Sequence, residues 1–353
     1  MRTSPVAPPR GAFDSATADA GARVRRRLAG LALLLGVLAL CTVLSVAVGA
    51  RGLAPAEVWR GLVAPDGGEA GAIVHGLRLP RTLLGLVVGA SLGVAGVLMQ
   101  SHTRNPIADP SLLGVAYGAA CAVVLSVFLL GLGDLSAYVW FAIGGALAAS
   151  VAVFAIASGG ARGPTPMTLL LAGAAMTALL SAITSAVVLL DERSLEVYRF
   201  WRVGSLSGRP AEVVYQILPF TAAGAALALA GMRGMNALAL GDDVATALGH
   251  RVRLIRASGV AAIALLCGAA VAAAGPIGFL GLMAPHAARA VTGPDHRWMV
   301  PYAALCGAAL ILAADVAGRV VRGSGEVEVG IVLAVLGGPF FIALVRRRRL
   351  IEL

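Results

Sequence analysis

The sequence contains no lysine, and charged residues of either sign are scarce. All 28 residues counted as lysine plus arginine are arginine, and charged residues make up 13% of the 353 positions. Soluble globular domains carry roughly 25% charged residues, so this composition excludes a chain built mainly of soluble domains. The missing lysine also excludes a P-loop ATPase within the chain, because that motif uses a lysine to reach the nucleotide phosphates.

Residues that perform redox or metal chemistry are few. The cysteines lie in apolar segments, and the sequence has no CxxC pair and no Cys/His cluster. This pattern is typical of small buried hydrophobic side chains and disfavours a disulfide or a metal site. The four residues are Cys41, Cys121, Cys267 and Cys306.

Carboxylates are rare inside the apolar segments. Asp315 and Arg319 stand four residues apart near the end of one segment, where they can pair along a helix. A proton- or sodium-coupled carrier usually has carboxylates near the midplane of several spans. Their scarcity disfavours an ion-coupled secondary transporter, which is the alternative from a different functional class.

Long apolar runs fill most of the chain. Hydrophobic residues make up 59% of the sequence, and the mean hydropathy is +0.88. Because a bilayer-spanning helix needs about 20 apolar residues, we expect an all-α polytopic membrane protein with about ten spans. The longest uncharged run splits into two spans at Gly275-Pro276. The expected spans are residues 28–50, 82–101, 111–133, 135–158, 166–190, 213–232, 299–318 and 328–345, together with two from the uncharged run 257–288, one of about 18 residues and a shorter one of about 16.

The two ends of the chain predict its orientation. Residues 1–22 are rich in Pro, Ala, Ser and Gly without apolar periodicity, which predicts a disordered cytoplasmic tail before a transmembrane domain at 23–353. Arginines cluster before the first span and at Arg346 to Arg349. An even number of spans and the positive-inside rule then place both termini in the cytoplasm. We therefore expect a multi-pass protein of the inner or plasma membrane.

The polar segment 232–256 carries an apolar pattern at helical intervals. It surrounds Gly241-Asp242-Asp243, where an aspartate can cap the start of a helix. A short cytosolic amphipathic helix ending at Gly249 and a solvated interhelical loop explain the pattern equally well.

The stretch GPIGFLGLMAPHAARAVTGPDHR, residues 275–297, is apolar but broken by proline and glycine. His286 and His296 invite comparison with a membrane-embedded metalloenzyme, yet no third ligand or general base accompanies them at a recognisable spacing. We therefore expect no metal site and no catalytic residue, and interpret the stretch as the inner edge of a helix bundle that repacks.

Several motifs, in order over about residues 55–350, resemble the FecCD-type permeases of ABC importers. They are RLPRTLLGLVVGASLGVAGVLMQ, RNPIADPSLLGV, ALGDDVATALG, GPIGFLGLMAPHAAR with GPDHR, and VGIVLAVLGGPFFIALVRR. The resemblance implies a vitamin B12 permease-like bundle of a type II importer, which moves an iron-siderophore complex or, alternatively, cobalamin or haem. It implies alternating access driven by a cytoplasmic P-loop ATPase dimer. It further implies an extracytoplasmic substrate-binding protein and a second permease subunit, identical or paralogous, in the lipid bilayer. No cofactor and no nucleic acid are expected.

The resemblance also implies roles for particular residues. Coupling helices at 238–250 would dock on the ATPase through Gly241, Asp242, Asp243, Ala245, Leu248 and Gly249. Binding-protein docking would use Arg78, Arg81 and Arg319. The alternatives are interfacial snorkelling for the first two arginines and an internal pair with Asp315 for the third.

The translocation path and its gate would lie along the fifth span and the residues before it. Family members often carry small hydroxyl residues at the inner gate, and this chain departs from that pattern. Hydroxyls within a span can also bond to their own helix. The residues concerned are Thr165, Pro166, Met167, Thr168, Thr177, Ser181, Thr184 and Ser185.

Overall fold

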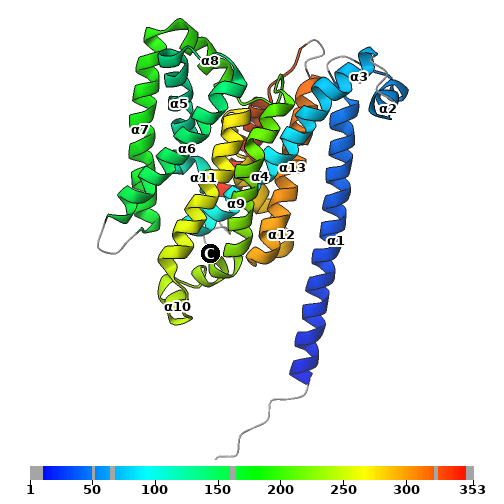
Figure 1. The fold of residues 1–353 in the computed structure, drawn as a ribbon. Coiled ribbons are helices and arrows are strands. Elements are labelled where there is room, and N and C mark those ends of the chain that lie inside the picture. The colour runs from blue at the N-terminus through cyan, green and yellow to red at the C-terminus, as the bar shows by residue number, and fades with distance from the viewer. Residues whose placement is uncertain (1–10, 50–51, 64–67, 160–163, 322–324, 347–353) are drawn as a thin grey trace, which may run out of the picture.

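The computed structural model describes residues 11–49, 52–63, 68–159, 164–321 and 325–346, and within these ranges the chain forms helices and no strand (Figure 1). Eight helices are long and apolar enough to cross a membrane, and two shorter ones, α5 and α12, lie among them. The ten are α1 (Gly11–Ala47), α4 (Leu79–Thr103), α5 (Val115–Leu130), α6 (Leu135–Ser158), α7 (Pro166–Leu190), α9 (Ala211–Leu238), α11 (Val252–Ala274), α12 (Leu280–Thr292), α13 (His296–Val321) and α14 (Val329–Arg346).

Each expected span corresponds to one of these helices, so the all-α membrane fold is confirmed. The largest difference lies at the amino end, where α1 begins at Gly11 and includes residues 11–22 of the expected tail. Alanine has the highest helix propensity, and its abundance in that stretch agrees with helix. Residues 1–10 of the expected tail and the arginines after Arg346 lie outside the described residues.

Short elements close the two ends of the bundle. One end carries α2 (Pro55–Val63), α3 (Glu69–Ile73) and α8 (Glu192–Arg202), and we call it the α8 end (Figure 1). The opposite end carries α10 (Asp242–Ala247), and we call it the α10 end. The π-helical turn Val74–Arg78 joins α3 to α4 without a break, and the 3-10 turn Pro110–Leu113 (η2) precedes α5.

The core forms around α4 and α11, whose spans are each 78% buried. Glycines let the helices beside α4 approach it closely. A Cβ added at Gly96 would collide with the backbone of Gly281 in α12, and one added at Gly93 would collide with Ala303 in α13. Because lipid provides no hydrophobic force between helices, such close approaches stabilise the bundle through dispersion contacts.

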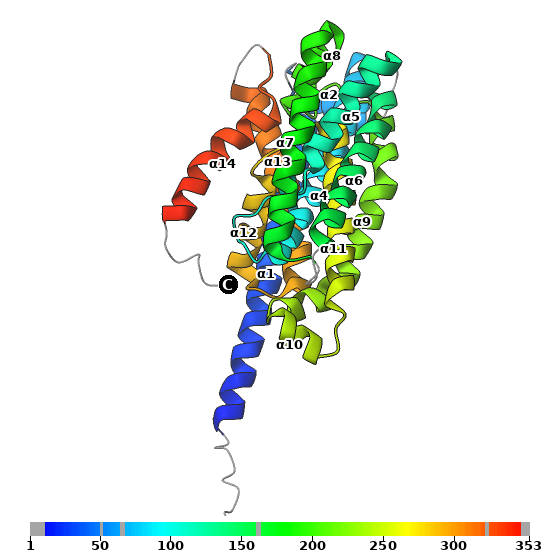
Figure 2. The same ribbon diagram turned by 90° about the vertical axis from the view of Figure 1, so that its left-hand side faces the viewer.

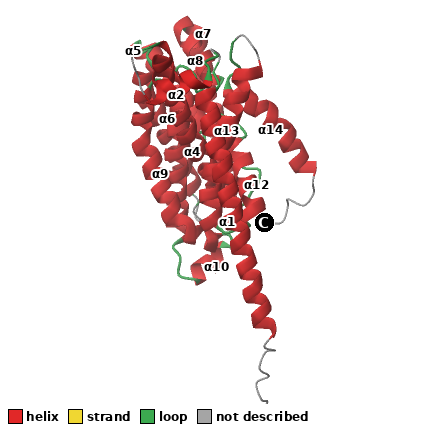
Figure 3. Cartoon of the chain, turned by 90° about the vertical axis from the view of Figure 1, so that its right-hand side faces the viewer, coloured by secondary structure: helices red, strands yellow, loops and turns green. Residues whose placement is uncertain are grey.

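Three helices at the periphery bury little of their surface. The buried share of the span is 11% for α1, 17% for α14 and 22% for α7. Figure 2 shows α14 leaning away from the bundle, and Figure 3 shows α1 extending beyond the α10 end. Apolar faces this open must contact lipid or another chain.

The long apolar run of the sequence breaks where the expected split lies. α11 ends at Ala274, Gly275 takes a φ of 76°, and α12 begins only at Leu280. Just before the irregular stretch, the carbonyl of Ala274 accepts the N–H of Ser205 at 2.7 Å. The break shortens α12 to 13 residues and places its first turn inside the bundle.

Candidate functional site

The arginine cluster at the α8 end, Arg78, Arg81 and Arg319, is almost fully buried, with 4%, 8% and 5% of each residue exposed. Asp315 lies at its centre. Its carboxylate accepts from Arg81 Nη2 at 2.7 Å and from Arg319 Nη2 at 2.6 Å. Two buried guanidinium groups therefore share one carboxylate that is itself 1% exposed.

The cluster also ties α1 to α4 and α13. Arg78 donates to the carbonyls of Val46 and Ala47 at 2.8 and 2.7 Å, and Arg319 donates to that of Ser45 at 2.8 Å. The internal Asp315–Arg319 pair is therefore confirmed. Snorkelling is wrong for Arg78, because its guanidinium turns inward to satisfy the last carbonyls of α1.

A cavity of about 340 Å³ adjoins the cluster. Arg209 lines it together with the cluster arginines, and Glu326 is the only carboxylate among the lining residues that the structure describes. Glu326 accepts from Arg81 Nη1 at 2.7 Å and from Ser207 Oγ at 3.1 Å. Guanidinium groups therefore outnumber carboxylates around this cavity, and its surface favours an incoming anion.

The segment expected to couple to the ATPase lies at the α10 end, and it is helical, as one of the two interpretations of its pattern predicts. Gly241 has a φ of 116° and Gly249 a φ of 82°, conformations that favour glycine at both ends of α10. Ala245 is fully buried against the bundle, whereas Leu248 is 61% exposed. Asp243 is exposed.

Asp242 faces the bundle. Its carboxylate accepts from Arg256 Nη2 at 2.9 Å and also pairs with Arg104. Arg104 is the residue that caps the carboxyl end of α4. The Arg256 side chain is 2% exposed, and Asp242 is its carboxylate partner among the described residues. We call the two contacts of Asp242 with Arg104 and Arg256 the Asp242 clamp. The sequence did not predict it. The available signal was Arg256 itself, a charge at the edge of a long uncharged run.

A second polar network joins α4, α9 and α13 at the same end. His296 lies between Ser101 Oγ, at 2.6 Å from Nε2, and Asn236 Oδ1, at 2.7 Å from Nδ1. Asn236 in turn donates to Asp295 at 2.8 Å. Burial acts to raise the pKa of the Asp295 carboxyl, but the hydrogen bonds from Asn236 and from the Arg297 N–H prevail and lower it.

His286 does not join that network. Its Nδ1 donates to the Leu282 carbonyl at 2.9 Å, and its ring lies 6.1 Å from that of Phe340 in α14. Among the described residues, no group of three His, Cys, Asp or Glu side chains could hold a metal ion.

The expected gate residues begin α7. Thr165 and Thr168 form a capping box, in which each side chain bonds to the backbone N–H of the other residue. Pro166 occupies the first turn, and Met167 is 64% exposed. Thr165, Thr168 and Pro166 therefore have a role in starting the helix.

The hydroxyls along α7 divide between two faces. Ser185 is exposed, and Thr177 and Ser181 are half-buried. Thr184 is 2% exposed and donates to the Leu180 carbonyl at 2.8 Å. The Thr184 hydroxyl thus bonds within its own helix and lies away from the exposed face, which is the alternative that the sequence left open for these residues.

The family model that matches this chain and its individual relatives indicate the same protein family. The model of the FecCD transport family matches residues 37–347. The chain is 44% identical over 326 residues to the ferric enterobactin transport system permease protein FepD of Escherichia coli (strain K12), covering 92% of this chain and 97% of that protein. It is 42% identical over 276 residues to the cobalamin import system permease protein BtuC of Halobacterium salinarum, covering 78% and 74%.

A solved structure agrees with the fold. An inward-facing metal-chelate type ABC transporter superposes with a TM-score of 0.79 at 27% identity, covering 89% of this chain and 97% of that one. The likeness extends over almost the whole bundle and leaves no large part of it unmatched.

Proposed function

The chain belongs to the FecCD transport family as a membrane-spanning permease of an ABC importer, and we propose that it carries an iron-siderophore complex inward. The proposed substrate is supported by the 44% identity, over nearly the full length of both chains, to a ferric enterobactin permease. The mechanism is alternating access, with ATP hydrolysed by a separate P-loop subunit pair.

The α10 end faces the cytoplasm in this proposal. Arginines are frequent there, in the first turns of α11 and at positions 23–27 of α1, where its apolar part begins, as the positive-inside rule requires. Both termini then lie in the cytoplasm, and the α8 end faces outward.

A substrate panel tests the proposed cargo. A strain lacking this gene is assayed for accumulation of labelled ferric catecholate, ferric hydroxamate, haem and cobalamin, with the complemented strain beside it. We expect loss of one or both ferric siderophores. Loss of cobalamin or haem uptake alone would favour the second candidate, which rests on the 42% identity to a cobalamin permease. Undiminished uptake of all four would overturn both.

Coupling to the ATPase runs through α10 and its flanking residues. Leu240, Val244 and Leu248 are 65%, 44% and 61% exposed around a helix whose Ala245 is fully buried. Apolar side chains this exposed at the water-facing end of a membrane protein favour a protein partner. The Asp242 clamp fixes the orientation of this apolar surface.

Leu248→Asp is expected to lower co-purification of the ATPase at least about tenfold, because an interface centre tolerates a buried charge poorly. The matched control is Leu195→Asp, which changes a leucine that is 44% exposed at the opposite, α8 end. ATPase recovery measured by quantitative immunoblot should fall for Leu248→Asp alone. Equal recovery with both variants would count against the coupling role of α10.

Docking of the extracytoplasmic binding protein uses the cavity beside the arginine cluster. A carboxylate of the binding protein would enter among Arg78, Arg81, Arg209 and Arg319, where guanidinium groups are in excess. The cluster arginines hold the cavity in shape, and Arg209, which is bonded only to the Ser205 carbonyl among the described contacts, offers the most accessible charge.

Arg209→Glu is therefore expected to weaken binding-protein affinity about tenfold or more without disturbing the Asp315 network. Arg193→Glu is the control, because Arg193 is exposed at the same end but lies outside the cavity. Surface plasmon resonance at low and high salt measures both. An unchanged affinity for Arg209→Glu would exclude this cavity as the docking site.

The path lies along the exposed faces of α7 and α14, against a second permease subunit that is either a copy or a paralogue. Both helices leave most of their apolar surface open in the single chain. With Thr184 turned inward, Thr177, Ser181 and Ser185 supply the hydroxyls of an otherwise apolar wall. Met167 extends from the cytoplasmic end of this wall.

A further inference from the structure

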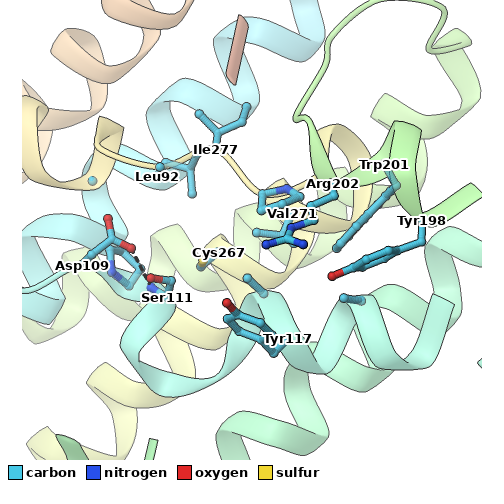
Figure 4. A pocket seen from close by; sticks show the side chains of 16 residues that line it. Leu92, Asp109, Ser111, Tyr117, Tyr198, Trp201, Arg202, Cys267, Val271 and Ile277 are labelled. Atoms are coloured by element: carbon cyan, nitrogen blue, oxygen red, sulfur yellow. Dashed lines mark hydrogen bonds between the residues drawn. The ribbon is translucent and has the colours of Figure 1, made fainter. Parts of the chain in front are cut away.

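A second cavity, of about 320 Å³, lies between α4, η2, α5, α8 and α11 (Figure 4). None of its lining residues belongs to the arginine cluster, the coupling segment or the hydroxyls of α7. Arg202 at one side of it is exposed, so the cavity is open toward the α8 end. We call it the α5–α8 pocket.

Hydrogen-bond donors gather at the α8 side of this pocket. The Arg202 guanidinium and the hydroxyls of Tyr117 and Tyr198 point into it (Figure 4). Arg202 stacks 5.8 Å from the Tyr198 ring, but neither its guanidinium nor either hydroxyl makes a hydrogen bond or ion pair within the described part of the chain. Unsatisfied donors that converge on one space favour an oxygen-bearing anion.

Trp201 adds a second, independent observation. The residue is 2% exposed, lines the pocket, and its indole Nε1 is buried without an acceptor among the described residues. A buried polar group without a partner is uncommon in native structures, because it has lost its bonds to water without replacement. Its ring and those of the two tyrosines give this side of the pocket flat aromatic surfaces.

The one carboxylate of the pocket lies apart from these donors. Asp109 is at the opposite side, beyond Cys267, and accepts the backbone N–H of Ser111 at 2.9 Å (Figure 4). The pocket is therefore divided into a donor-rich aromatic half and an acidic half. The size of the whole is near the lower limit, roughly 300 Å³, of small-molecule sites, so it holds part of a chelate and not all of it.

We propose that the α5–α8 pocket receives an anionic aryl arm of the transported chelate, with its oxygens on Arg202 and the two tyrosines and its ring beside Trp201. The proposal rests on iron-chelate import as the function. It makes Arg202, Tyr117 and Tyr198 residues that select negatively charged, aryl-bearing chelates over uncharged ones.

Uptake by cells tests the selectivity. Arg202→Gln is expected to lower uptake of a negatively charged ferric catecholate about tenfold, mainly through KM, because a charge-assisted bond is lost. Uptake of an uncharged ferric hydroxamate should change less than about twofold. The matched control is Arg199→Gln, three residues earlier on α8, whose guanidinium stacks on Phe200 outside the pocket. Tyr198→Phe, which removes one hydroxyl, should act in the same direction as Arg202→Gln.

Binding of a probe separates this proposal from the proposed function. Saturation-transfer NMR measures the binding of 2,3-dihydroxybenzoate to the purified permease in phosphatidylcholine nanodiscs. Inorganic phosphate is added as a competitor in one series, and discs that contain phosphatidylglycerol are used in another. We expect binding that Arg202→Gln weakens about tenfold and Arg199→Gln leaves unchanged. Absent binding, or displacement by phosphate or phosphatidylglycerol alone, would overturn the pocket while leaving iron-chelate import standing. Binding without any chelate uptake would instead count against the transport function.

Discussion

Asp315→Asn is expected to be the most destabilising single substitution at the α8 end. The change removes a negative charge that is 1% exposed and shared by the buried Arg81 and Arg319. Removing one partner of a buried ion pair costs about 3–5 kcal/mol, because the remaining charges stay buried without compensation. We expect a marked fall in the fraction of detergent-purified protein that elutes as a monodisperse peak after heating.

Glu326→Gln is the matched control for this prediction. Glu326 meets the same Arg81 guanidinium at 2.7 Å, but its side chain is 22% exposed, and it accepts from no second arginine among the described residues. Its substitution should therefore change the thermal midpoint much less than Asp315→Asn. Equal midpoints for the two variants would contradict the view that Asp315 holds the cluster together.

Asp242→Asn is expected to abolish most transport while leaving the bundle folded. The substitution leaves the Arg256 guanidinium, 2% exposed, without its carboxylate, and it frees the amino end of α10 from Arg104. Asp242 itself is 45% exposed, so the stability cost should stay below the about 3–5 kcal/mol of a fully buried pair. The loss should appear as at least about tenfold lower uptake in the substrate panel, because α10 no longer holds one orientation.

Two further variants sharpen this test. Thr246→Ala changes a residue of the same helix whose hydroxyl bonds only to the Asp242 carbonyl, so uptake should stay within about twofold. The double variant Asp242→Leu with Arg256→Met should recover thermal stability relative to Asp242→Asn, since the buried Arg256 charge is then removed together with its partner. Wild-type uptake by Asp242→Asn would show that the clamp has no part in coupling.

The helices of this fold follow closely from the sequence. Lipid requires every backbone group to bond within its own helix, so apolar runs such as residues 135–158 and 166–190 predict α6 and α7 with the observed bounds. The break at Gly275 is equally local, because glycine tolerates its positive φ of 76°. Backbone chemistry acting over a few residues sets all of these features.

The pairing of charges could not be predicted in the same way. Arg81 and Asp315 are 234 residues apart in sequence, and only the packing of α4 against α13 brings them together. The pattern around α10 agreed equally with a helix and a loop, and it did not give the direction of Asp242, which the resemblance assigned to the ATPase surface and the structure turns toward Arg256. A one-dimensional pattern gives the face of a helix, not the partner that the face meets.

The α7 hydroxyls show the same limit within a single helix. Thr184 and Ser185 are neighbours in sequence, yet one is 2% exposed and the other lies on the open face. Which of them lines a path depends on where α5 packs against α7. The hydroxyl residues of α7 recur at helical spacing in the sequence. That spacing does not show which of them lie on the buried face of the helix and which lie on the exposed face.

The geometry joins the two functional ends through one helix. α4 carries Arg81 in its first turn, inside the arginine cluster, and ends beside Arg104, which pairs with Asp242 of α10. Its span is 78% buried. A tightly packed helix therefore contacts both the cavity proposed for docking and the Asp242 pair at the start of the proposed coupling helix.

Reconstitution tests the central claim most directly. The purified permease is placed in liposomes with its ATPase and binding protein, and uptake of a radiolabelled ferric siderophore is measured with no ion gradient across the membrane. We expect uptake that requires ATP on the α10 side together with both partners, and we expect Leu248→Asp to abolish it. Uptake that proceeds without the ATPase, or that follows an imposed proton or sodium gradient, would contradict this expectation.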